Sequence, residues 1–209
     1  HIGGTTIHSW TGIGIKTKLT KYDLNKIAEN KNVAKRILQT KILVIDEVSM
    51  LPKDTLSMVD TVCRKIKKMG DLPFGGIQII LVGDFFQLPP IVRVDKRGLQ
   101  SSSLHSSQKQ PALLENPQNP LSHFAYNSPS WDNAKFTTCY LSEQYRQDDK
   151  KFLSLLGAIR SNKFTDAHHR QIEKRKINFK DAPDNAPKLF THNFDVDRIN
   201  EEKLSKIPG

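Results

Sequence analysis

Two short apolar runs constrain the fold of this chain more than any other feature of its sequence. Residues 42–45 read Ile-Leu-Val-Ile, and residues 77–82 read Ile-Gln-Ile-Ile-Leu-Val. Short, nearly continuous apolar runs are typical of strands that are buried on both faces of a parallel sheet. We therefore predict two inner strands of such a sheet.

The segment between the two runs predicts a helix. Pro52 begins it, at a position where the missing backbone N–H of proline costs nothing. The apolar positions that share one helical face are Leu56, Val59, Val62 or Cys63, Ile66 and Met69. A strand, a helix and a second strand in this order form a parallel crossover, so the sequence predicts an α/β fold.

A polar stretch separates this first region from the rest of the chain. Residues 20–38 carry a helical stripe that begins with a possible capping box of Thr20 and Asp23. Residues 98–123 are rich in Ser, Gln, Asn and Pro and cannot build a core. The predicted division is a first domain at 1–97, an insertion and linker at 98–135, and a second domain at 136–209.

The second domain is predicted to be a further α/β lobe. Residues 136–141 and 188–191 have the composition of strands. Asp148 or Asp149 is placed to cap a helix that follows. Val196, Ile199 and Leu204 would line one face of a final helix.

Charge and composition narrow the class of protein. The chain has 209 residues and a formal net charge of +10, so nucleic acid is the leading class of partner. No apolar stretch approaches the ~20 residues of a membrane-spanning helix, and the first residues do not resemble a secretory signal. Cys63 and Cys139 are too few for a disulfide framework. We expect both to be small buried residues of an intracellular protein.

Two acidic residues follow the first apolar run directly. Asp46 and Glu47 would lie at the carboxyl end of a buried strand, where open α/β sheets bind ligands. One carboxylate can hold Mg²⁺ through water, and the other can orient or deprotonate an attacking water. This is the Walker B pattern of ATPases, although two acids at a strand end can also be simple helix N-terminal charges.

A second polar cluster follows the second run. Gly83 permits a sharp turn, and the amide of Gln87 can donate to a phosphate oxygen and accept from water. Pro89 and Pro90 stiffen the segment. Asp84 either contributes to a nucleotide site or caps a turn. We expect both clusters to converge on one crevice.

These segments together resemble the PIF family of superfamily 1 DNA helicases. DEVSML and PFGGIQIILVGDFFQLPP resemble motifs II and III, and DTLSMVDTVCRKIKK resembles the signature segment between them. GGTTIHSWTGIG is similar to motif Ia. LSEQYRQDDKKFLSLLGAIRSNKF is similar to motif IV and the helix after it, and KLFTHNFDVDRINEEKL to the next strand and helix. The resemblance implies a RecA-like P-loop NTPase fold, with most of a first motor domain and the start of a second.

The resemblance also implies roles for individual residues. Asp46 would help to bind Mg²⁺, Glu47 would activate water, and Gln87 would sense the γ-phosphate of ATP. Arg146 matches the arginine finger of the second motor domain; a surface ion pair with Asp148 or Asp149 is the alternative.

Contacts to single-stranded DNA are implied at five positions. His8 and Ser9 match residues that touch the strand, and Pro89 belongs to the same expected interface. Phe86 is a candidate for stacking on bases, as is Trp10, for which packing in the core is an equal alternative. The resemblance implies 5′-to-3′ unwinding from single strands and duplex junctions, in DNA replication, repair, recombination or telomere maintenance. The compartment would be the cytoplasm, the nucleus or the mitochondrion.

The chain departs from the family pattern at both ends. It contains no G-x-x-x-x-G-K-[ST] loop, and it lacks the motifs that follow motif IV. We interpret it as a fragment that alone would hydrolyse almost no ATP. A non-catalytic nucleic-acid-binding remnant of a helicase is the main alternative. A relative of the RecD or relaxase-linked helicases would share the chemistry, whereas a small-molecule kinase has no use for motif III or the arginine segment.

Overall fold

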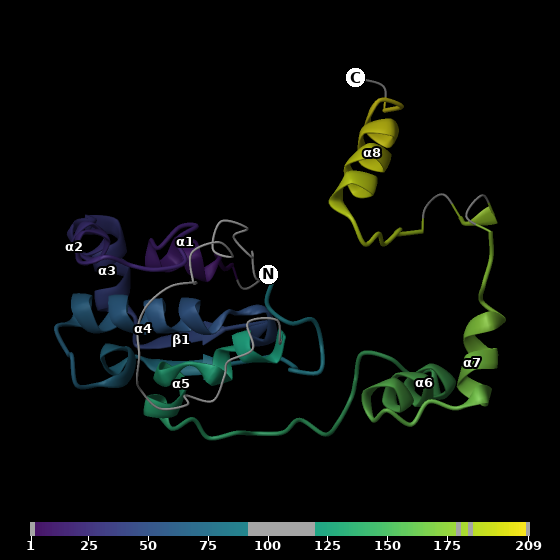
Figure 1. Cartoon of the computed structure of the whole chain (residues 1–209), viewed down its shortest axis with the longest axis horizontal. Coiled ribbons are helices and arrows are strands. Elements are labelled where there is room, and N and C mark those ends of the chain that lie inside the picture. Colours follow the sequence, from purple (N-terminus) through teal and green to yellow (C-terminus); the bar gives the residue numbers. More distant parts are fainter. Residues whose placement is uncertain (1–2, 92–119, 179–180, 184–185, 208–209) are drawn as a thin grey trace, which may run out of the picture. The chain divides into compact units, whose positions relative to one another are not determined.

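The computed structural model describes residues 3–91, 120–178, 181–183 and 186–207, and it divides into two compact units (Figure 1). The first unit is His1–Ser142 and the second is Glu143–Gly209. Within the described residues, no helix is both long enough and apolar enough to cross a lipid bilayer.

The first unit contains the predicted parallel strand pair. Strand β1 (Ile42–Ile45) lies parallel to strand β2 (Gln78–Leu81), with Ile42 opposite Gln78 and Ile45 opposite Leu81. Helix α4 (Lys53–Lys67) makes the crossover, which confirms the α/β prediction. Burial on both sheet faces is wrong for these residues: Leu43 and Ile45 belong to the core, but Val44 is 58% exposed. Their partners on β2, Ile79 and Leu81, are partly buried against the same core.

Helix α4 is the centre of the first unit. Leu56, Val59, Val62 and Cys63 are fully buried and Ile66 is 7% exposed, as the stripe predicts. The helix packs against α1 (Ile7–Thr11), α2 (Lys21–Glu29) and α3 (Lys31–Gln39). Two details differ from the prediction. Met69 lies beyond the helix and is 48% exposed, and Pro52 precedes the helix in an extended conformation.

The helix predicted at 20–38 is two helices. Asn30 interrupts it with an extended backbone, and its Oδ1 accepts hydrogen bonds from the backbone N–H groups of Asn32 and Val33. Asparagine is a strong N-cap, so its side chain begins α3 instead of allowing α2 to continue. The capping box of Thr20 and Asp23 at the start of α2 is confirmed.

Residues 120–136 belong to the first unit, not to a linker. Turns η4 (Pro120–His123) and η5 (Ala125–Asn127) lead into α5 (Pro129–Ala134). Phe136 then meets the rings of Phe74 and Trp131. The predicted boundary at 136 is therefore too early, and the first unit ends at Ser142. Residues 98–119 of the predicted insertion, together with residues 92–97 before it, lie outside the described residues.

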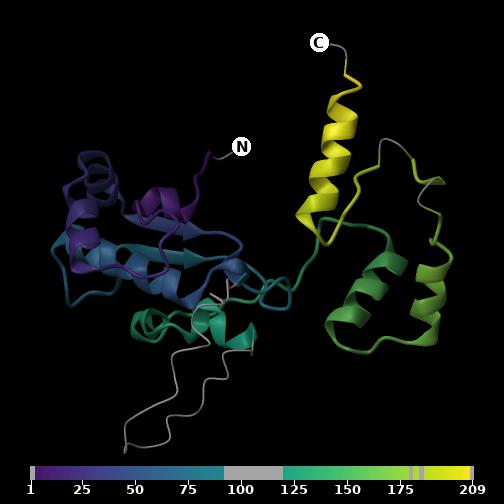
Figure 2. The same cartoon turned by 45° about the horizontal axis from the view of Figure 1, so that its top comes forward.

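The second unit is helical where it is described (Figure 2). It contains α6 (Lys150–Arg160), α7 (Asp166–Glu173) and α8 (Asn193–Leu204). Asp149 caps α6 by accepting from the N–H groups of Lys151 and Phe152, so Asp149 is the cap of the two candidates.

Two predicted strands do not form. Residues 136–141 and 188–191 form neither strand nor helix in the described structure, and Leu141 and Leu189 are almost fully exposed. A strand needs a hydrogen-bonded neighbour, which β-forming residues alone do not supply. Cys139 lies in the first of these stretches and is exposed, contrary to expectation, whereas Cys63 is buried as predicted.

Candidate functional site

The backbone beyond the ends of β1 and β2 brings the two polar clusters to one edge of the sheet. The N–H of Val82 donates to the carbonyl of Ile45 at 2.9 Å, and the N–H of Val48 donates to the carbonyl of Val82 at 3.0 Å. Gly83 allows this close approach, because a Cβ there would lie 2.9 Å from the backbone nitrogen of Val48. Asp46 and Glu47 therefore lie next to Gly83 and Asp84.

The two acids are exposed at this edge. Asp46 Oδ1 accepts a hydrogen bond of 2.8 Å from the N–H of Glu47. Glu47 has a left-handed backbone (φ 53°, ψ 44°), which is uncommon for a residue with a side chain and is a form of strain found at functional sites. The chain then turns inward as η1 (Val48–Met50), where Val48 and Ser49 are buried. The bend leaves both carboxylates accessible to a ligand.

Asp84 organises the turn that carries Gln87. Asp84 Oδ1 accepts from the N–H of Phe86 at 3.1 Å, and Oδ2 accepts from Nε2 of Gln87 at 3.3 Å. The carbonyl of Asp84 also accepts from the N–H of Gln87 at 2.9 Å. Of the two roles left open for Asp84, these bonds support the turn-capping one, and they hold Gln87 beside the acids' edge.

The predicted DNA-contacting residues fall on two elements. His8, Ser9 and Trp10 lie on α1, which begins at the cap Thr6 and ends at Gly12 in the left-handed conformation. Trp10 is half-buried and packs against the core, which supports the packing alternative. Phe86 is 75% exposed, as stacking on a base requires, and Pro89 is half-buried.

Arg36 of α3 holds α1 in place. Its Nε and Nη2 donate to the carbonyl of Trp10 at 3.0 and 2.6 Å, and Nη2 also donates to the carbonyl of Ser9 at 3.0 Å. A guanidinium group that satisfies the last carbonyls of a short helix stabilises that helix end. The sequence alone does not reveal this role, because a single arginine within a helical stripe gives no local signal of it.

Arg146 lies in the second unit and is exposed. It stands at a bend in the irregular segment that precedes α6. Its role opposite the nucleotide stays a prediction.

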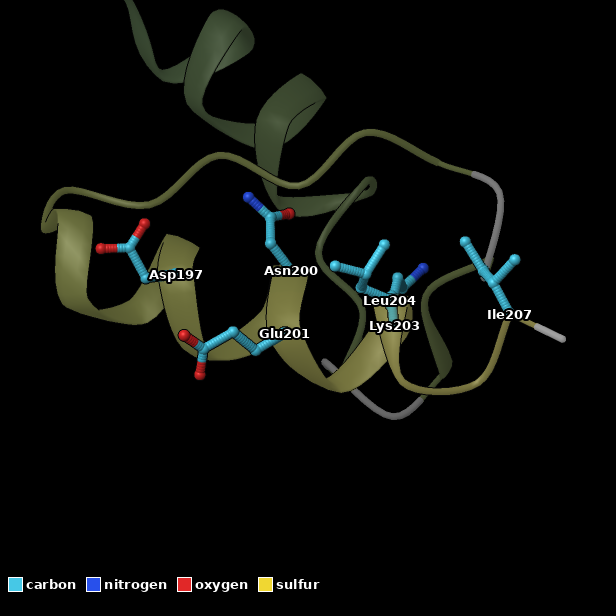
Figure 3. Close-up of a pocket in the computed structure, with 6 residues that line it drawn as sticks. All are labelled: Asp197, Asn200, Glu201, Lys203, Leu204 and Ile207. Atoms are coloured by element: carbon cyan, nitrogen blue, oxygen red, sulfur yellow. The ribbon is translucent and has the colours of Figure 1, made fainter. Parts of the chain in front are cut away.

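A shallow depression in the second unit contains none of the predicted site residues. It is lined by Asp197, Asn200, Glu201, Lys203, Leu204 and Ile207, which come from α8 and the turn that follows it (Figure 3). Acidic, basic and apolar groups are mixed along one helix there. This arrangement does not select a ligand, and we assign it no site.

Comparisons with known proteins identify the family. The chain matches the description "PIF1-like helicase" over residues 1–170. It is 36% identical to the ATP-dependent DNA helicase Pif1 of Psychrobacter sp. and 33% identical to the human ATP-dependent DNA helicase PIF1, in each case over 100% of this chain and 29% of the relative. The chain thus spans about three-tenths of the length of these relatives.

Solved structures of Pif1 helicases are also similar to this chain. The Pif1 helicase from Bacteroides in complex with ADP-AlF3 and ssDNA has a TM-score of 0.74 and 28% identity, covering 99% of this chain and 44% of that one. The Pif1 helicase from Candida albicans has a TM-score of 0.75 and 28% identity, covering 100% of this chain and 42% of that one. These matches confirm the α/β, RecA-like fold class. With a family match over most of its length, the chain belongs to the PIF1-like helicase family.

Proposed function

We propose that the chain is part of an ATP-dependent DNA helicase. This part would contain the catalytic acids, the γ-phosphate sensor and a surface that binds single-stranded DNA. One observation carries this proposal: the continued pairing beyond β1 and β2 sets Asp46 and Glu47 at the same sheet edge as the Asp84–Gln87 turn. A nucleotide at that edge would meet both clusters at once, as motor action requires.

Three side chains would divide the hydrolysis chemistry. Glu47, exposed on its bent backbone, would orient a water and accept its proton. Gln87, which donates one amide hydrogen to Asp84, keeps its carbonyl oxygen for that water and its second amide hydrogen for a phosphate oxygen. Arg146 of the second unit would stabilise the charge on the departing phosphoryl group.

Asp46 suits a magnesium ion that arrives with the nucleotide. Its carboxylate is exposed, and one of its oxygens is oriented by the N–H of Glu47. Among the described residues, no group of three or more His, Cys, Asp or Glu side chains could hold a metal. The exposed carboxylate of Asp46 fits Mg²⁺, which is usually bound by one or two carboxylates together with water and substrate phosphates. When bound, the ion would neutralise charge on the phosphate oxygens.

Helix α1 and the turn after β2 would bind the DNA. Ser9 and Phe86 are exposed, and the chain's net charge of +10 attracts phosphates. The Bacteroides structure is in complex with ssDNA, and another Pif1 structure addresses forked dsDNA. We extend single-stranded DNA and duplex junctions to this protein as substrates, with 5′-to-3′ movement. The relatives are bacterial and eukaryotic DNA helicases, which supports our proposal of an intracellular compartment.

The test is the ATPase activity of the full-length protein with and without single-stranded DNA. We expect DNA to stimulate hydrolysis, and Glu47→Gln to lower kcat by about 10²–10⁴-fold, because the amide cannot accept the proton. Glu29→Gln, at an exposed position of α2, is the matched control and should keep the wild-type kcat.

The binding-remnant alternative predicts a different result. Salt-dependent binding to single-stranded DNA without any ATP hydrolysis by the full-length protein would favour it. The presence of Asp46, Glu47, Gln87 and Arg146 together argues against it, since a binding module needs none of these four side chains.

A further inference from the structure

We propose that Phe85 is a positioning residue that holds Gln87 at the sheet edge through a cluster of aromatic rings. It would set the rate of ATP hydrolysis without touching the nucleotide. This inference rests on the proposed function, in which Gln87 contacts the γ-phosphate. The sequence does not distinguish the adjacent phenylalanines, but the structure does: Phe86 is 75% exposed, whereas Phe85 packs against the core.

The Phe85 ring meets three other rings edge to face. Its centroid lies 5.5 Å from that of Phe124, 5.0 Å from that of Tyr126 and 6.0 Å from that of Trp131. The interplanar angles are 87°, 83° and 71°. Edge-to-face contacts depend on orientation because the positive ring edge faces the negative ring face. Three such contacts fix the direction of the Phe85 side chain and of the backbone next to it.

This anchor complements the bonds made by Asp84. The three hydrogen bonds between Asp84 and residues 86 and 87 lie within the turn and give it its shape. The ring of Phe85 adds a connection between that turn and a distant stretch of the sequence. Asp84 therefore gives the turn its shape, and Phe85 determines where the turn, and with it Gln87, is placed.

The segment that carries the three partner rings is itself held on α4. Ser128 Oγ lies 2.8 Å from Ser57 Oγ, and Ser130 Oγ donates to Oδ2 of the buried Asp60 at 2.8 Å. Phe124 is only 2% exposed. The position of Gln87 is thus tied to the central helix of the unit. Catalytic groups need such support, because small displacements reduce rates strongly.

The experiment compares Phe85→Leu with Phe136→Leu in the full-length protein. Phe136 is a ring of the same unit that meets Trp131 and Phe74, with centroid separations of 4.9 and 6.4 Å. We expect Phe85→Leu to lower kcat about tenfold while KM for ATP and affinity for single-stranded DNA stay within about twofold. Phe85→Tyr, which keeps the ring, should restore most of kcat. Phe136→Leu, which removes a contact of Trp131 but none of Phe85, should lower kcat clearly less than Phe85→Leu does.

Two results overturn the inference. One is an unchanged kcat in Phe85→Leu; the other is an equal loss in Phe136→Leu, which would reveal an effect of general stability. If Phe85→Leu does not fold, Tyr126→Leu removes a partner ring instead and is subject to the same expectations.

Amide hydrogen exchange separates this inference from the proposed function. Phe85→Leu should accelerate exchange of the Phe86 and Gln87 amides, which both bond to Asp84, and Phe136→Leu should not. This measurement needs no activity. Absence of DNA-stimulated ATPase in the wild-type protein would refute the proposed function, whereas unchanged exchange in Phe85→Leu would refute the positioning role.

Discussion

The two units of this chain use the same local devices with different amounts of packing behind them. The first unit has a continuous core in which Leu56, Val59 and Val62 are fully buried. In the described part of the second unit, Leu155 and Ala158, each 8% exposed, are the buried hydrophobic residues, and α7 and α8 bury none. Helices of the second unit therefore depend more on their own caps and side-chain pairs.

Two ion pairs, one in each unit, illustrate this difference in packing. Arg64–Asp60 and Lys206–Glu202 have the same i,i+4 spacing and the same separation of 2.8 Å. Asp60 is buried and also accepts from the N–H of Phe74 and from Ser130 Oγ, whereas Glu202 lies on the surface. A buried acid with several donors joins separate elements, while an exposed pair contributes little. An ion pair at i,i+4 spacing therefore connects separate elements of the fold only where its acidic side chain is buried.

The largest expected effect comes from replacing one leucine of each unit by alanine. We expect Leu56→Ala, at a fully buried position, to lower the free energy of unfolding of the first unit by about 2–5 kcal/mol. Leu156→Ala, at a position that is 42% exposed, should cost clearly less, because its methyl groups already contact water. Denaturant unfolding monitored separately in each unit measures both. Equal losses of unfolding free energy would show that Leu156 is packed as tightly as Leu56, which would contradict the difference between the two units.

A second test adds one methyl group to a glycine in each unit. Gly83→Ala would bring a Cβ to 2.9 Å from the Val48 nitrogen, so the paired chain ends must separate. We expect a loss of about 1–3 kcal/mol in stability, together with reduced ATPase activity of the full-length protein. Gly157→Ala lies in α6 with open space around it and should stabilise that helix by about 0.5–1 kcal/mol.

Thermal unfolding and ATPase measurements check this pair of substitutions. A neutral Gly83→Ala would contradict the close approach of the two strand ends. It would also weaken the observation on which the proposed function depends.

What the sequence predicts well are features that depend on neighbours in the chain. The apolar runs at 42–45 and 77–82 identify the parallel pair, and the spacing from Leu56 to Ile66 identifies the buried face of α4. The backbone after β1 and β2 meets at one edge, as expected for parallel strands, and this brings Asp46 and Glu47 next to Gly83 and Asp84. A nucleotide crevice shared with Gln87 stays a prediction. Asn30 could have been identified as a break, since an asparagine within a helical stripe is a capping signal.

Features that depend on distant contacts escape sequence reasoning. Nothing local distinguishes Phe85 from Phe86, because rings more than thirty positions away decide which of them is held. Phe136 looks like the start of a strand, yet its contacts with Phe74 and Trp131 assign it to the first unit. The role of Arg36 likewise depends on carbonyls at Ser9 and Trp10.

The smallest expected effect concerns the helix caps, and it carries a pH dependence. Thr20→Ala and Asp149→Ala remove the N-caps of α2 and α6, and each should cost about 1 kcal/mol. The cap of α2 is reciprocal, because Thr20 also donates to Asp23 through its hydroxyl and its N–H. These bonds, with Lys16 adding to them, lower the pKa of Asp23 from 3.8 to about 2.

The sign of this effect follows from which state binds the proton more tightly. The unfolded state takes up a proton on Asp23 at a higher pH than the folded state does, so the contribution of Asp23 to stability is fully present above pH ~4 and is lost as pH falls towards 2. An NMR titration of the Asp23 carboxyl measures its pKa directly. In Thr20→Ala that pKa should rise, because the hydroxyl that contributes most to the shift is removed. An Asp23 that titrates near 4 in the wild-type chain would show that the reciprocal cap does not form in solution, and α2 would then depend on tertiary packing alone.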